Sequence, residues 1–148
     1  MRTTKVTDKE YPIFMTEDEI KARVRKMAEH MNRGFAGEIP LFIAVLSGSF
    51  IFAADLMRYI NIPCEIEFVR VSSYEGTSTT GQVKQLLGLK EDITDRHVVI
   101  VEDIIDSGRT LAHLSRYLKL KGAKSVRTCT LLDKPDRREV EFTADYVG

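Results

Sequence analysis

The fold is decided by residues 98–110, which read Val-Val-Ile-Val-Glu-Asp-Ile-Ile-Asp-Ser-Gly-Arg-Thr. The run from His97 to Val101 is apolar after its first residue, as in a strand that helices cover on both faces of a sheet. A turn of small residues around Gly108 then leads into leucines at helical spacing. These are Leu111, Leu114, Leu118 and Leu120, and Gly122 is placed to end the helix. The stretch therefore predicts a crossover unit of strand, turn and helix that continues into another strand at residues 126–132.

Elements of the same two kinds alternate along the rest of the chain. A capping box at Thr16 and Glu19 opens a helix. Its apolar stripe comprises Ile20, Val24, Met27, Ala28 and Met31. Further elements are expected as strands at 41–46 and 65–71, a helix at 50–60, hairpin strands within 83–89 and a tail strand within 140–147. The pattern predicts an α/β fold with a mainly parallel central sheet, and we expect residues 1–148 to form a single domain.

The amino-acid composition of the chain argues against several classes of function. The chain has 148 residues, of which 43% are hydrophobic, enough for one continuous core. Lys and Arg together number 22, as do Asp and Glu, so the net positive charge typical of a nucleic-acid-binding protein is missing. No apolar run approaches the length that spans a membrane. Cys64 and Cys129 lie in apolar stretches that look like buried strands, which favours packing over a disulfide framework. We therefore expect a cytoplasmic protein that binds neither nucleic acid nor membrane.

The turn at residues 106–110 and the acids before it suit a sugar phosphate. Backbone N–H groups of residues 107–110 would converge at the start of a helix, where unpaired donors and the helix dipole favour an anion, and Gly108 allows close approach. Glu102 and Asp103 follow the strand and can accept hydrogen bonds from vicinal hydroxyls or ligate a hard divalent cation. The competing interpretation is that acids and a glycine at a strand end form only a solvated loop.

Residues 98–110 resemble the ribose-phosphate signature of the type I phosphoribosyltransferases, and are most similar to the hypoxanthine (hypoxanthine-guanine) phosphoribosyltransferases within that family. Three further motifs stand in the family's order, at residues 45–50, 73–74 and 131–135. The resemblance implies a three-layer fold, with a mainly parallel central sheet flanked by helices and a flexible loop or hairpin.

The resemblance also implies roles on the sugar-phosphate side of the site. Glu102 and Asp103 would hold the ribose hydroxyls and Mg²⁺, and Asp106 would assist proton transfer at the purine ring. The residues implied to bind the 5-phosphate, besides these three, are Ser107, Gly108, Arg109 and Thr110.

On the pyrophosphate and purine sides, the implied residues come from other segments. Pyrophosphate would contact Leu46, Ser47, Gly48 and Arg70, although Arg70 also fits a strand-edge cation; the family often has a non-proline cis peptide in this loop. Ser73 and Tyr74 would belong to a lid over the reacting centre. Ile104 would pack on the base or in the core. Lys134, otherwise a surface lysine, would donate to the exocyclic oxygen of a 6-oxopurine, so that adenine is rejected.

The implied reaction transfers the phosphoribosyl group of phosphoribosyl diphosphate to a 6-oxopurine base. Hypoxanthine or guanine would give the nucleotide product and pyrophosphate, in a homodimer or homotetramer. The family continues beyond the position of Gly148 with a segment that covers the purine, so we expect weakened or absent turnover from this chain.

Two other functions fit parts of the pattern. A nucleotide-sensing regulator on the same fold would bind the sugar phosphate without turnover. A receiver-type signalling domain would use the acids after residues 100–101 and Asp133, but its acid pair follows the first strand, whereas here it follows most of the chain.

Overall fold

The structure is a computed structural model that describes residues 3–6, 9–12, 15–73, 83–87, 89, 92–105 and 108–148. Its main sheet has six strands in the order β5-β4-β3-β6-β7-β8. Their bounds are Leu41–Val45 (β3), Glu65–Ser73 (β4), Val83–Leu87 (β5), His97–Ile105 (β6), Ser125–Asp133 (β7) and Tyr146–Val147 (β8). All neighbours in this sheet pair in parallel except β4 and β5, which are antiparallel. The predicted fold class, a mainly parallel sheet with one hairpin, is confirmed.

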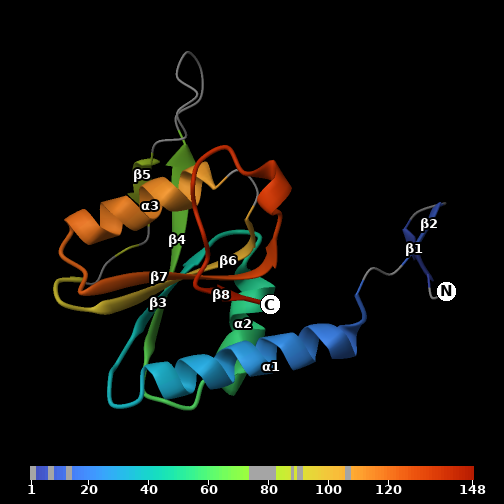
Figure 1. Cartoon of the computed structure of the whole chain (residues 1–148), viewed down its shortest axis with the longest axis horizontal. Helices are drawn as coiled ribbons and strands as arrows, with labels where there is room; N and C mark the ends of the chain where they lie inside the picture. The colour runs from blue at the N-terminus through green and yellow to red at the C-terminus, as the bar shows by residue number, and fades with distance from the viewer. Residues whose placement is uncertain are drawn as a thin grey trace.

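Three α-helices form the outer layers (Figure 1). Helices α1 (Glu17–Gly34) and α2 (Phe50–Tyr59) pack on one face of the sheet, and α3 (Arg109–Leu120) packs on the other. A 3-10 turn, η1 (Pro135–Arg137), follows β7. Two short strands, β1 (Thr3–Val6) and β2 (Lys9–Pro12), pair only with each other, and the sequence patterns gave no sign of this hairpin. None of the described helices combines the length and the apolar character needed to cross a bilayer.

Helix α1 begins as the capping box predicts. The N–H of Glu19 donates to the Thr16 hydroxyl at 3.1 Å, and that hydroxyl donates to the Glu19 carboxylate at 3.1 Å. The buried residues of the helix are Val24, Met27, Ala28 and Met31, with Ile20 half-buried at the margin. The predicted stripe is therefore confirmed, and it fixes which face of α1 meets the sheet.

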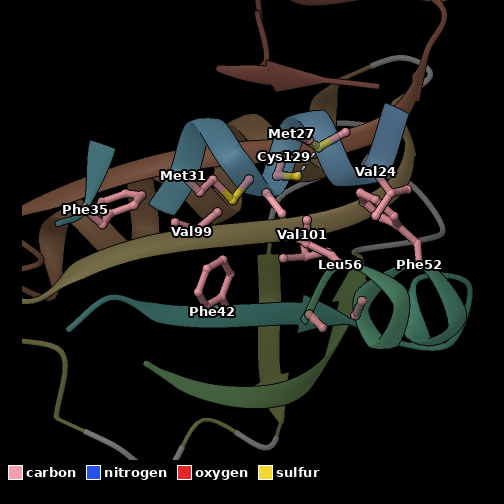
Figure 2. Packing of buried hydrophobic residues seen from close by; sticks show 13 residues of the cluster. Val24, Met27, Met31, Phe35, Phe42, Phe52, Leu56, Val99, Val101 and Cys129 are labelled. Atoms are coloured by element: carbon pink, nitrogen blue, oxygen red, sulfur yellow. Dashed lines mark hydrogen bonds between the residues drawn. The ribbon is translucent and has the colours of Figure 1, made fainter. Parts of the chain in front are cut away.

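The core under α1 and α2 is made by alternate residues of the central strands (Figure 2). Val99 and Val101 of β6 point into it, whereas Val98 and Ile100 belong to the core on the α3 face. This alternation is what a strand covered on both sides requires. Cys129 of β7 is fully buried with its thiol directed at the Met27 sulfur, as expected. Cys64 also packs against this core, but it is half-buried and precedes β4, so its expected place within a buried strand is wrong.

The core on the opposite face receives Leu111, Leu114 and Leu118 of α3. Leu120, which was expected to share this stripe, is 82% exposed. Two residues beyond Leu118 correspond to a rotation of about 200° on a helix, which turns the side chain away from the sheet. Gly122 has a φ of +97° and follows the last helical turn, as predicted for a C-terminal glycine.

Two strand boundaries differ from the sequence expectation in ways that matter for the site. Strand β6 continues to Ile105, so Glu102 and Asp103 lie within the strand and not after it. The tail contributes only Tyr146–Val147, which pair with Cys129 and Thr130 of β7. The residues between η1 and β8 form no regular element, although they contact the start of α3 as described below.

Candidate functional site

Functional side chains gather at the carboxyl ends of β3 and β6, where α/β sheets commonly bind ligands. Glu102 and Asp103 occupy the second half of β6, and both are half-buried. Alternation between the two core faces does not extend through these acids, because Val101 belongs to the core under α1 and α2 whereas Ile105 belongs to the core on the α3 face. The Glu102 and Asp103 carboxyls instead interact with each other through a side-chain hydrogen bond near the strand end.

Asp103 lies directly against the loop that joins β3 to α2. A Cβ added to Gly48 would lie 2.9 Å from one Asp103 carboxylate oxygen and 3.3 Å from the other. A side chain at position 48 would thus require the acid or the loop to move, and glycine avoids this cost. The close approach brings the expected pyrophosphate loop and one expected ribose acid to the same place.

The loop itself is anchored at both ends. The Leu46–Ser47 peptide is cis, in agreement with the family expectation. The N–H of Leu46 donates to the carbonyl of Val69 at 2.8 Å, which places the loop beside Arg70, an exposed residue of β4. Ser49 is fully buried, and its hydroxyl donates to the carbonyl of Val45. These bonds hold the start of α2 against the end of β3 and leave Ser47 and Gly48 at the surface.

Burial raises the pKa of Glu102 to about 8, and a hydrogen bond with the Asp103 carboxyl adds to the rise. The N–H of Asp103, which donates to Glu102 at 3.1 Å, opposes this shift by stabilising the charged form. Near neutral pH the folded chain therefore keeps a proton on Glu102 for much of the time. A cation at this carboxyl would have to displace that proton, so its binding would strengthen as the pH rises toward 8.

The donor set fits a magnesium ion that is shared with a phosphorylated substrate. Within the described ranges, no group of three or more His, Cys, Asp or Glu side chains comes together to hold a metal. Glu102 and Asp103 supply two adjacent carboxylates, and Mg²⁺ is commonly held by one or two carboxylates together with water and substrate phosphate oxygens. The pair is therefore suited to a substrate-bound cation and not to a metal enclosed by protein.

The start of α3, where a phosphate-binding turn is expected, is described from Gly108 onward. Gly108 is the N-cap with a φ of +83°, a conformation that residues with a Cβ rarely adopt. Arg109 and Thr110 form the first turn of the helix, and both are half-buried. Asp106 and Ser107 lie outside the described residues, so their expected roles stay predictions.

The expected purine residues are joined to the same strand end. The N–H of Lys134 donates to the carbonyl of Ile105 at 2.9 Å, while the Lys134 side chain is exposed. Ile104 is half-buried and pairs with Leu132 across the β6–β7 ladder. Of the two residues expected in the lid, Ser73 ends β4 opposite Val83, and Tyr74 is among the undescribed residues. The predicted lid therefore lies largely outside the described part of the chain.

Sequence reasoning missed two ion pairs beside the phosphate turn. Arg138 pairs with Asp133 at 2.5 Å, and Arg109 pairs with Glu139 at 2.6 Å. The segment that holds Arg138 and Glu139 has neither helical nor strand periodicity, so no pattern singled them out. The sequence contains one indication of this contact, Gly108, because glycine permits a neighbouring group to approach closely. In the structure, a Cβ at this position would lie 2.7 Å from the Arg138 side chain.

Comparison with known proteins decides the family. The phosphoribosyl transferase domain family matches residues 16–148 of this chain. The chain belongs to the phosphoribosyltransferase family. It is 46% identical over 139 residues to the hypoxanthine phosphoribosyltransferase of Buchnera aphidicola subsp. Schizaphis graminum, an alignment that covers 92% of this chain and 78% of the relative. The Salmonella typhimurium hypoxanthine phosphoribosyltransferase is 45% identical over the same shares of both chains.

A solved phosphoribosyltransferase has the same fold. The crystal structure of a hypoxanthine-guanine phosphoribosyltransferase from Bacillus anthracis superposes with a TM-score of 0.85 at 45% sequence identity, over 93% of this chain and 80% of that one. The receiver-domain alternative is not favoured, because the phosphoribosyltransferase family matches residues 16–148, which include the acids and Asp133 on which that alternative depends.

Proposed function

We propose that this phosphoribosyltransferase serves purine salvage by moving the 5-phosphoribosyl group of phosphoribosyl diphosphate to hypoxanthine, and to guanine as a second base. The products are the nucleotide, IMP or GMP, and pyrophosphate. The observation that carries the proposal is 43–46% identity, over most of the chain, to enzymes named for this activity. The approach of Gly48 to Asp103 supports it, since sugar and leaving group must meet at one point.

In this proposal Glu102 and Asp103 hold the ribose hydroxyls and ligate Mg²⁺. When bound, Mg²⁺ neutralises the charge that develops on the departing pyrophosphate. The loop of Leu46, Ser47 and Gly48 offers backbone groups to pyrophosphate on the sheet face where Asp103 reaches the sugar. The sugar carbon is thus held between the base and the leaving group, which is the chief contribution that a rigid site makes to such a transfer.

The 5-phosphate is held at the start of α3 by the backbone amides of residues 107–110. The unpaired N–H groups of the first helical turn and the helix dipole both favour an anion there. Asp106, just before this turn, accepts the proton that the purine nitrogen loses as the new bond forms. Ser73 and Tyr74 close over the centre and keep water from the positively charged sugar carbon.

Lys134 selects the base. Its ammonium group donates to the exocyclic oxygen of a 6-oxopurine, whereas the amino group of adenine would face it with a second donor. A site built around such a donor rejects the wrong group strongly, because the unpaired Lys134 would be partly desolvated without compensation. Ile104 packs on one face of the ring and orients it toward the sugar.

The domain organisation, the oligomeric state and the location of the protein are inferred from the same family resemblance. We propose that residues 1–148 act as one phosphoribosyltransferase core domain, working as a homodimer or homotetramer in the cytoplasm. The assay for IMP formation also tests whether turnover is weak, as the sequence predicts.

The deciding experiment measures IMP formation from hypoxanthine and phosphoribosyl diphosphate with Mg²⁺, with adenine as the control base. We expect IMP with hypoxanthine, GMP at a comparable or lower rate with guanine, and no AMP. Binding of phosphoribosyl diphosphate without any nucleotide product would contradict turnover by this chain, and it would agree both with the absent turnover expected from the sequence and with the nucleotide-sensing regulator. Equal rates with adenine would remove the role given to Lys134.

A further inference from the structure

Arg138 connects three segments that meet at the phosphate turn. Its Nη2 lies 2.5 Å from an Asp133 carboxylate oxygen, and its Nε donates to the carbonyl of Phe142 at 3.0 Å. Its aliphatic stem packs on Gly108, where an added Cβ would lie 2.7 Å from Arg138 Cδ. The side chain is only 13% exposed, so the guanidinium is largely removed from water. A buried charge of this kind is tolerated because it is paired and hydrogen-bonded.

Two of the three segments, those of Gly108 and Asp133, carry or border an expected ligand contact. Gly108 caps α3 at the 5-phosphate turn. Asp133 is the last residue of β7 and immediately precedes Lys134, the residue proposed to select the base. The guanidinium can therefore fix the distance between the sugar-phosphate end and the base end of the site, because its planar fork restricts where both partners lie.

We propose that Arg138 is a positioning residue of the transferase reaction: it holds the 5-phosphate turn and the Lys134 segment in the register that places the purine against the sugar. The inference rests on the proposed function but concerns a residue outside the family motif. Arg138 acts through Gly108, Asp133 and Phe142 and has no assigned contact with substrate. A neighbouring pair, Arg109 with Glu139 at 2.6 Å, links the same two segments nearer the surface.

The test compares Arg138→Met, which keeps the stem over Gly108 but removes both polar bonds, with Arg138→Lys, which keeps the charge near Asp133. Arg137→Met is the matched control, because this neighbouring arginine is exposed. For Arg138→Met we expect the KM for phosphoribosyl diphosphate to rise about 10- to 100-fold, with a lower kcat for hypoxanthine, as small displacements of a substrate produce. Arg138→Lys should recover part of the loss, and Arg137→Met should stay near the wild-type values.

A double variant separates the ion pair from simple packing. If the Asp133 contact carries the effect, then adding Asp133→Asn to Arg138→Met causes little further loss, whereas independent contributions would multiply. The folded fraction of each variant is measured by circular dichroism under the assay conditions. If Arg138→Met lowers kcat only in proportion to its folded fraction, with both KM values unchanged, then Arg138 is merely structural and the inference is wrong.

Calorimetric binding of ribose 5-phosphate keeps this inference distinguishable from the proposed function. A wild-type chain that binds ribose 5-phosphate but forms no IMP contradicts the function alone. In that case weaker ribose 5-phosphate binding by Arg138→Met, but not by Arg137→Met, supports the positioning role, and equal binding overturns it. A wild-type chain that binds no ribose 5-phosphate contradicts both.

Discussion

Polar residues have different roles at the two ends of β6. At the amino end, Arg96 pairs with Glu65 at 2.7 Å and donates to the carbonyl of Ile39 at 3.2 Å, while His97 shares a 2.6 Å hydrogen bond with Ser125. At the carboxyl end, Glu102 is buried enough for its pKa to rise to about 8, and Asp103 borders a glycine. Polar groups at the first end hold strands together. The acids at the second end are kept at some cost in stability, which is typical of groups reserved for a ligand.

The largest expected effect comes from removing charge at the carboxyl end. Asp103→Asn and Glu102→Gln should each lower kcat/KM for IMP formation by about 100-fold or more, because they weaken the hold on the cation and the ribose. Thermal unfolding without ligand should change little, or shift upward for Glu102→Gln, which removes a buried ionisable group. If both variants keep full activity, the comparison between the two strand ends fails.

Gly48→Ala tests the close approach of the loop to Asp103. The new Cβ would lie 2.9 Å from a carboxylate oxygen, so loop or acid must move. We expect kcat/KM to fall about 10- to 100-fold. Gly34→Ala is the matched control, since its Cβ would meet the Tyr146 hydroxyl at an ordinary 3.7 Å. Equal activity of the two variants would mean that the loop position is not important for the reaction.

The raised pKa of Glu102 predicts how stability depends on pH. The folded chain keeps this proton up to about pH 8, whereas the unfolded chain loses it near the ordinary glutamate pKa of 4.5. Glu102 therefore stabilises the fold fully below pH 4.5, and this contribution is lost as the pH rises toward 8. The slope is up to about 1.4 kcal/mol per pH unit. Urea unfolding across this range should show a smaller slope for Glu102→Gln, and an unchanged slope would contradict the assignment.

The smallest effect is expected at the amino end. Glu65→Gln removes an ion pair with Arg96 whose side chains are 46% and 22% exposed. Such a pair contributes about 1 kcal/mol or less, so the free energy of unfolding should fall only slightly and kcat/KM should not change. A large loss of activity in this variant would show that the two ends of β6 are not independent.

The parts of the fold that sequence could predict are those with a regular period. The apolar run of β6, the leucines of α3 and the glycine that ends this helix, Gly122, each follow from a local rule about alternation, helical spacing or a missing Cβ. The family resemblance added the cis peptide at Leu46–Ser47 and the expected roles around it.

The rest depends on contacts between segments without a period. Asp133 ends β7 and Arg138 follows η1, so no single helical or strand spacing relates these two residues. The extension of β6 through Glu102 and Asp103 depends on pairing with β7, which the acids alone do not reveal. Asp106 and Ser107, the centre of the predicted phosphate turn, remain predictions because they lie outside the described residues.

Because Cys129 is buried, the reaction of its thiol with a labelling reagent would report when the core opens. Its thiol has no exposure to solvent, and burial raises its pKa, so the reactive thiolate is suppressed while the sheet is closed. A thiol-modifying reagent can then reach Cys129 only when β7 separates from α1, whereas the half-buried Cys64 is accessible sooner. The lag between the two labelling reactions would time core exposure in the native chain, without an added dye or a substitution.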